Sequence, residues 1–133
     1  MKYLALLFLP FFISCSSSTT ATDADPANEK YSEGLAVYER TCVACHQAGG
    51  EGVDGAFPPL AKSDYLLTDK NRAINQIING SSGEMTVNGK VYNTIMPPQE
   101  LNDEEIKDVM NYILNAWGNT GGEVTLDDVK AQR

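Results

Sequence analysis

Residues 42–46 read Cys42-Val43-Ala44-Cys45-His46, and this short stretch decides the fold. The C-x-x-C-H pattern is typical of sites where two thiols bind the vinyl groups of one c-type haem. When such a segment is helical, two intervening residues let both sulfurs reach one porphyrin, and the adjacent imidazole lies under the iron. The sequence therefore predicts one covalently bound haem c, held by Cys42 and Cys45, with His46 as an axial ligand of the iron.

Three other interpretations of the same residues are a thioredoxin-type redox pair, a zinc site and a structural disulfide. A thioredoxin motif lies between a strand and a helix of a βαβ unit, and the residues around 42–46 do not have that pattern. Structural zinc needs four ligands, and His46 is the one histidine of the chain. The single histidine also excludes a second imidazole ligand from this chain, so the haem interpretation needs another kind of sixth ligand.

The chain has four methionines, and the sequence separates them. The first leaves with the signal peptide, and Met110 belongs to an apolar helical stripe that predicts a core position. Met96 precedes two prolines, which stiffen the loop and exclude helix. A thioether is a weak ligand for iron, so a loop held in place beforehand keeps it bound. We predict Met96 as the second axial ligand, with Met85 as the next candidate.

The N-terminus predicts export and a lipid anchor. Residues 1–14 are one lysine and an apolar run too short to span a bilayer, which is typical of a signal peptide. The residues that end at Cys15 resemble the lipobox of bacterial lipoproteins, in which the cysteine is acylated and becomes the mature N-terminus. Residues 15–30 are small, polar and acidic and predict a flexible tether. We expect a protein of the periplasm or cell envelope, lipid-anchored to a membrane.

The net charge disfavours one class of partner. The formal net charge of −8 disfavours nucleic-acid binding, which depends on cations that contact phosphate. Acidic residues are spread along the chain, which predicts a solvated surface rather than a single acidic face. Residues 31–133 suffice for one modest core, and we expect a monomer.

Three motifs together resemble a class I c-type cytochrome over residues 31–118. They are the C-x-x-C-H motif, Phe57-Pro58-Pro59-Leu60, and the Met-Pro pair followed by Leu101-Asn102-Asp103-Glu104-Glu105-Ile106. The resemblance implies an all-α fold in which three main helices surround one covalently bound haem. It also implies that the Pro58 carbonyl accepts a hydrogen bond from the imidazole of His46, and that the N- and C-terminal helices cross near Gly34.

The helical pattern of the sequence agrees with that fold. Apolar spacing and caps predict helices over residues 28–45, 69–79 and 103–117, with Tyr38 and Tyr112 at the helix crossing. Asn88-Gly89 predicts the turn of a small β-hairpin over residues 85–92. The long glycine- and proline-rich loop between these segments, residues 47–68, is acceptable if it wraps a ligand.

Residues 119–133 form a C-terminal extension with a predicted helical turn at 126–130. This extension resembles the tail of cytochrome c domains associated with copper nitrite reductases and similar respiratory enzymes. If His46 and Met96 fill both axial positions, the iron has no open site and passes electrons only. We therefore expect an electron carrier and not an enzyme.

The expected redox partners are a quinol-oxidising complex or dehydrogenase as donor and a terminal reductase or oxidase as acceptor, with copper nitrite reductase as one candidate. Two alternatives stay open. One is a haem enzyme or a gas or peroxide sensor with an open sixth coordination site. The other is a thiol oxidoreductase or structural lipoprotein without haem.

Overall fold

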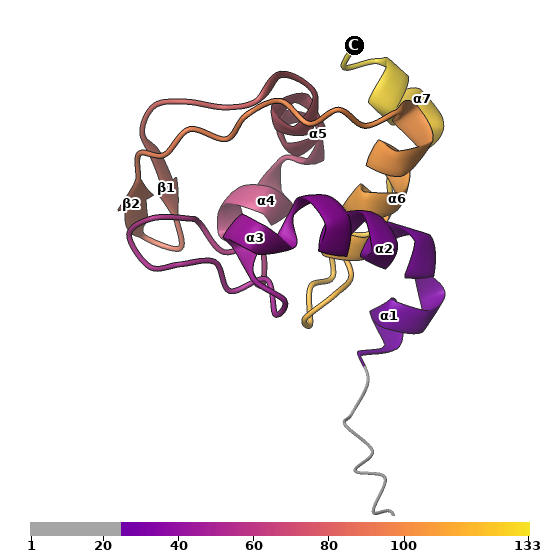
Figure 1. Cartoon of the computed structure of the whole chain (residues 1–133), viewed down its shortest axis with the longest axis horizontal. Helices are drawn as coiled ribbons and strands as arrows, with labels where there is room; N and C mark the ends of the chain where they lie inside the picture. Colours follow the sequence, from indigo (N-terminus) through magenta and orange to yellow (C-terminus); the bar gives the residue numbers. More distant parts are fainter. Residues whose placement is uncertain (1–24) are drawn as a thin grey trace, which may run out of the picture.

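A computed structural model describes residues 25–133 of the chain. The predicted signal peptide, the predicted lipidation site Cys15 and most of the predicted tether lie outside the described residues. Short helices and one hairpin follow each other along the chain (Figure 1), in the order α1 (Pro26–Lys30), α2 (Ser32–Thr41), α3 (Val43–His46), α4 (Asp64–Thr68), α5 (Lys70–Asn79), β1 (Met85–Val87), β2 (Lys90–Tyr92), α6 (Asp103–Ile113) and α7 (Leu126–Lys130). The predicted helical fold with a small hairpin is confirmed. None of the helices in the described part of the chain is long and apolar enough to cross a membrane.

The crossing of α2 and α6 forms the centre of the core. Gly34 of α2 is buried, and a Cβ at this position would overlap the backbone carbonyl of Asp108 in α6. The close approach brings Tyr38 and Tyr112 together, with ring centroids 5.5 Å apart. The ring of Trp117 lies 5.1 Å from that of Tyr38, so three aromatic rings pack at one place. The predicted helix crossing at Gly34 is confirmed.

The predicted N-terminal helix is broken into three. Tyr31 leaves helical geometry between α1 and α2, with φ −119° and ψ 44°. Cys42 separates α2 from α3, with φ −110° and ψ −30°. Each break involves a single residue, which is too short an interruption for the apolar spacing to mark.

Two other helix predictions need correction. The helix predicted to reach Trp117 ends at Ile113, and the backbone then passes through turns into the left-handed region at Trp117 and Gly118, where φ is 56° and 79°. Within the predicted long loop, α4 forms a short helix. The Ser63 side chain caps it by accepting a hydrogen bond from the amide of Leu66. Five residues carry too little periodicity to be recognised as a helix.

The hairpin and the cap of α6 match the sequence. Asn88 and Gly89 form the turn with φ of 50° and 77°, and Met85 pairs with Tyr92 across the two antiparallel strands. Asn102 and Glu105 form the reciprocal capping box that begins α6. The hairpin lies on the side of the molecule opposite α6 and α7 (Figure 1).

The C-terminal extension is part of the core. Val129 of α7 is buried completely, and Val124 before it is 4% exposed. The side chain of Asn111 in α6 bonds both backbone groups of Val124, as donor to the oxygen and acceptor from the nitrogen. Lys30 at the end of α1 forms an ion pair with Glu123 at 3.0 Å, which joins the extension to the first helix.

Candidate functional site: a haem pocket

His46 ends α3 with one ring nitrogen already occupied. Its Nδ1 lies 3.0 Å from the carbonyl oxygen of Pro58, which can only accept, so Nδ1 carries the proton and donates it. Burial lowers the pKa of His46, and the bond to Pro58 offsets part of that effect. The neutral ring therefore keeps Nε2 unprotonated, which is the form that binds a metal.

Cys42 and Cys45 lie at the start and in the body of the same helical turn. The amides of Cys45 and His46 both donate to the carbonyl of Cys42, at 3.2 and 3.0 Å, so the motif is locally helical as the haem interpretation requires. The two thiols are not joined to each other. Burial, and then the neighbouring Cys45, raises the pKa of Cys42 to about 11. A thiol that stays protonated at neutral pH does not resemble the low-pKa thiolate of a thioredoxin-type pair.

Met96 is fixed by backbone contacts to the end of α5. The amides and carbonyls of Met96 and Ser81 exchange two hydrogen bonds, each 2.9 Å long. Gly80 has a φ of 75°, and a Cβ there would lie 2.6 Å from the Met96 carbonyl oxygen. The loop therefore approaches the helix end more closely than a larger residue would allow. The Met96 loop is held in place by the protein itself, as the sequence argument required.

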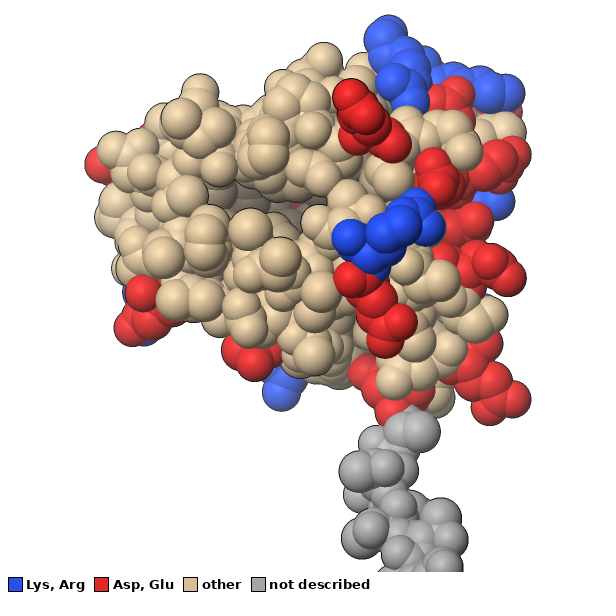
Figure 2. Space-filling model, viewed as in Figure 1, with Lys and Arg blue, Asp and Glu red and all other residues tan. Residues whose placement is uncertain are grey.

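One apolar cavity collects the predicted site residues. His46, both cysteines, Pro58 and Met96 all line it, together with residues from α4, α5, β1 and α6, and none of the lining residues is Asp, Glu, Lys or Arg. Figure 2 shows the cavity as a hollow surrounded by uncharged side chains, while most of the charged side chains in that view lie over α6, α7 and α1. A porphyrin, with two large apolar faces, suits such a lining.

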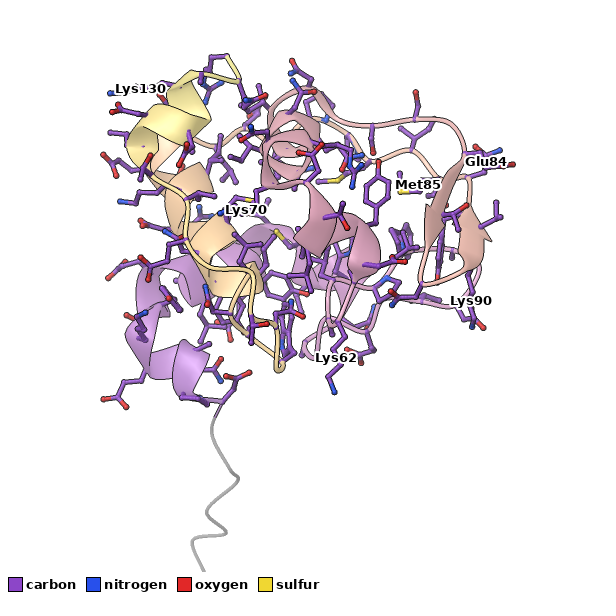
Figure 3. The ribbon with its side chains drawn as sticks, turned by 180° about the vertical axis from the view of Figure 1, so that it is seen from behind. Lys62, Lys70, Glu84, Met85, Lys90 and Lys130 are labelled. Carbon is purple, nitrogen blue, oxygen red and sulfur yellow. The ribbon has the colours of Figure 1, made fainter. Side chains whose placement is uncertain are left out.

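Met85 lines the same cavity as Met96. Figure 3 shows its side chain directed inward from β1, whereas the neighbouring Glu84 points away from the molecule. Both candidate thioethers are thus brought to one cavity. The two methionines are held by different elements, because Met96 lies in a loop hydrogen-bonded to the end of α5 and Met85 lies on a strand of the hairpin.

Polar side chains suited to carboxylate groups line the cavity from α4 and α5. The hydroxyl of Tyr65 accepts a hydrogen bond from Gln76 at 3.2 Å, and both side chains line the cavity. The guanidinium of Arg72 lies over the Tyr65 ring, 3.6 Å from its centroid. Its Nε is buried and has no partner among residues 25–133. A cation with one unused donor, behind a wall lined by a hydroxyl and an amide, fits an anionic group in the cavity.

Sequence reasoning did not find Tyr65, Arg72 or Gln76. Arg72 and Gln76 are four residues apart, which places them on one face of a helix. That spacing is common in helices, and no pattern in the sequence indicated that Tyr65 of another helix meets this face. In the described part of the chain, no group of three or more His, Cys, Asp or Glu side chains is placed to hold a metal ion.

Comparisons with known proteins agree with this geometry. The family model for cytochrome c matches residues 31–117. Cytochrome c-552 of Thermus thermophilus is 40% identical over 91 residues, which cover 65% of this chain and 69% of the relative. The cytochrome c subunit of a quinone alcohol dehydrogenase from Gluconobacter oxydans (strain 621H) is 31% identical over 103 residues, which cover 75% of this chain and 22% of that subunit.

A third relative is the cytochrome subunit of fructose dehydrogenase from Gluconobacter japonicus. It is 33% identical over 110 residues, which cover 78% of this chain and 22% of the subunit. The match to both dehydrogenase subunits thus involves about one fifth of their length, whereas the match to cytochrome c-552 involves most of that protein. The helical fold and the C-x-x-C-H helix at an uncharged cavity agree with these relatives. The chain therefore belongs to the cytochrome c family and is a class I monohaem cytochrome, an electron carrier with one covalently bound haem c.

Proposed function

We propose that Cys42 and Cys45 form the thioether bonds to the haem and that His46 and Met96 bind its iron from opposite sides. The observation that carries this assignment is the bond from His46 Nδ1 to the Pro58 carbonyl, which leaves Nε2 free for a metal. The fastened loop before the two prolines supports Met96 over Met85. The haem, when bound, supplies one-electron exchange between ferric and ferrous iron.

We also propose that the haem carboxylates lie toward α4 and α5. The Tyr65 hydroxyl accepts from Gln76, so its own proton is free to be donated to a carboxylate. Arg72 stacks on the Tyr65 ring and donates to the Tyr65 backbone carbonyl, which holds the side chain in one orientation. The positive charge of Arg72, partly buried behind Tyr65, favours an anion on the cavity side.

With both axial positions filled, the iron has no open site for oxygen, peroxide or a substrate. The carrier accepts one electron from a quinol-oxidising complex or a dehydrogenase and passes it to a terminal reductase or oxidase, with copper nitrite reductase as one candidate acceptor. The names of two relatives, which are cytochrome subunits of dehydrogenases, support a dehydrogenase donor. Partners dock weakly over the mouth of the cavity, where the uncharged rim permits rapid release.

We also propose that the N-terminal segment attaches this carrier to a membrane. Residues 1–14 are a lipoprotein-type signal, Cys15 carries the lipid, and residues 15–30 are a tether for a monomeric cytochrome domain at 31–118 with its extension at 119–133. The Ser- and Thr-rich composition after Cys15 supports the tether. A lipid anchor would confine the protein to the surface of a membrane in the periplasm or cell envelope and raise its concentration near membrane-bound partners.

Optical spectroscopy of the purified holoprotein tests the ligand assignment. A ferric protein with iron bound to a thioether shows a weak band at the red end of the visible spectrum, and its ferrous form does not bind carbon monoxide. Without this band, and with carbon monoxide binding to the native protein, the open-site alternative would replace the electron carrier. Stopped-flow mixing with purified candidate reductases and oxidases then identifies the partner by rate.

A further inference from the structure

Asn119, in the turn after α6, is a buried side chain whose amide has three hydrogen-bond partners. It is 5% exposed. Its Nδ2 donates to the carbonyls of Leu60 and Ile113 at 3.0 and 2.6 Å, and its Oδ1 accepts from the amide of Lys62 at 2.6 Å. A buried amide with three partners is rigid, because each bond that breaks leaves an unpaired polar group. Asn119 thus fastens residues 60–62 to the end of α6.

The fastened segment directly follows the carbonyl that orients His46. Residues 58 and 59 are both proline and have no amide hydrogen, so the Pro58 carbonyl lies in a stretch that donates no backbone hydrogen bond of its own. Its position is therefore set from the two flanks. On one side Phe57 pairs with Val53 through two backbone bonds of 2.8 Å. On the other side lies the segment held by Asn119.

Two glycines, Gly50 and Gly52, also contact the backbone of residues 58–61. The amides of Leu60 and Ala61 both donate to the Gly50 carbonyl, at 2.7 and 2.9 Å. A Cβ at Gly52 would lie 2.8 Å from the Pro58 carbonyl oxygen, so the backbone at Gly52 packs directly under it. Gly50 fixes one side of residues 60–62 and Asn119 fixes the other. Loss of the Asn119 bonds would free the side of the segment that faces α6.

We propose that Asn119 is a positioning residue for the proximal ligand: it sets the bond between Pro58 and His46 and so lowers the reduction potential of the haem. This inference rests on the proposed ligation of the iron by His46. A carbonyl that accepts from Nδ1 makes the imidazole a stronger donor, and a stronger donor favours ferric iron. A looser carbonyl weakens the donor and raises the potential. The C-terminal extension thus acts on the iron through Leu60, Lys62 and Pro58.

The test compares Asn119→Ala and Asn119→Ser with Asn115→Ala in the full holoprotein. Asn115 is a matched control, because its Nδ2 donates to the carbonyls of Asn111 and Gly122, at 2.9 and 2.8 Å, and so fastens the same tail without touching residues 58–62. Two quantities are measured for each variant: the midpoint potential, and the hydrogen exchange rate of the His46 Nδ1 proton by NMR. Both Asn119 variants are expected to raise the potential and to speed this exchange about tenfold. Asn115→Ala is expected to change only the stability.

The proposal is overturned if the Asn119 variants lose stability while their potential and Nδ1 exchange match those of wild type. A measurement on the unmutated protein covers the case in which neither Asn119 variant folds. The Lys62 amide, which donates to Asn119, should then exchange as slowly as the central amides of α6, and fast exchange would contradict the proposal. Hyperfine-shifted imidazole resonances of the ferric protein report separately whether His46 binds the iron at all.

Discussion

Gly34 of α2 lies against the backbone carbonyl of Asp108 in α6, at a contact with no room for a Cβ. We expect Gly34→Ala to lower the free energy of unfolding by about 1–3 kcal/mol, the usual cost of overpacking. This loss occurs although alanine favours helix over glycine by about 1 kcal/mol. Urea denaturation of the holoprotein measures it.

Gly49→Ala serves as the control for that substitution. A Cβ at Gly49 would meet only the carboxylate end of the Glu51 side chain, which can rotate away. Its free energy of unfolding should therefore stay near that of wild type. Equal losses in the two variants would mean that the close helix crossing has no special cost.

Replacement of the distal ligand is the direct test of the axial pair. Met96→Ala should lower the midpoint potential and open the ferrous iron to carbon monoxide, because thioether ligation raises the potential and fills the sixth site. The measurement is a redox titration followed by gas binding. Met85→Ala is the control, since Met85 lines the same cavity and should leave both properties unchanged. The opposite result for the two variants would assign the iron to Met85.

The hydroxyl of Tyr65 gives a prediction about the haem carboxylates. Tyr65→Phe removes the proposed donor but keeps the ring beside Arg72, so the haem should still bind. A carboxylate with one donor fewer keeps more negative charge near the iron, which favours the ferric state and lowers the midpoint potential. Tyr31→Phe is the matched control, because the Tyr31 hydroxyl donates to Glu123 at 2.8 Å and lies outside the cavity lining. Identical potentials in the two variants would remove Tyr65 from the haem site.

The exposed rim of the cavity gives a prediction about docking. Ile95 is 74% exposed and lines the cavity, whereas Val91 is 55% exposed on the same hairpin side and does not line it. Ile95→Glu should slow electron transfer to the physiological partner about tenfold, which corresponds to about 1.4 kcal/mol. Val91→Glu adds the same charge, so any long-range electrostatic effect is shared by both variants. Stopped-flow rates that fall equally would place the docking site elsewhere.

Lipid attachment can be tested at Cys15. Cys15→Ala should release the cytochrome from the membrane fraction into the soluble periplasm, because one acylated cysteine is the proposed anchor. Fractionation followed by a haem stain measures the distribution, since thioether-bound haem stays on the denatured chain. A variant that stays with the membranes would indicate a retained signal peptide or another anchor.

Which features can be predicted from the sequence depends on how far apart in the chain the interacting residues lie. The C-x-x-C-H turn, the capping box at Asn102 and the Asn88-Gly89 turn are set by neighbours within a few residues, and all three form as predicted. The contact of Gly34 with α6 was reached through a family resemblance rather than through local pattern. Other contacts join segments far apart in the chain. Examples are the close approach of Gly80 to the Met96 carbonyl and the bonds from Asn119 to residues 60–62. No periodicity records such pairs, so they appear only in the folded molecule.

The chain contains one tryptophan, and its position gives the protein an internal fluorophore. The Trp117 indole donates to the Ala48 carbonyl at 3.1 Å, and its ring leaves no space for a Cβ at Gly50. The indole therefore touches the loop after the C-x-x-C-H helix as well as the rings of the helix crossing. Its emission should be quenched by energy transfer to a nearby haem in the native state and should rise when these two regions separate. Unfolding of the carrier can thus be followed in real time without any added dye.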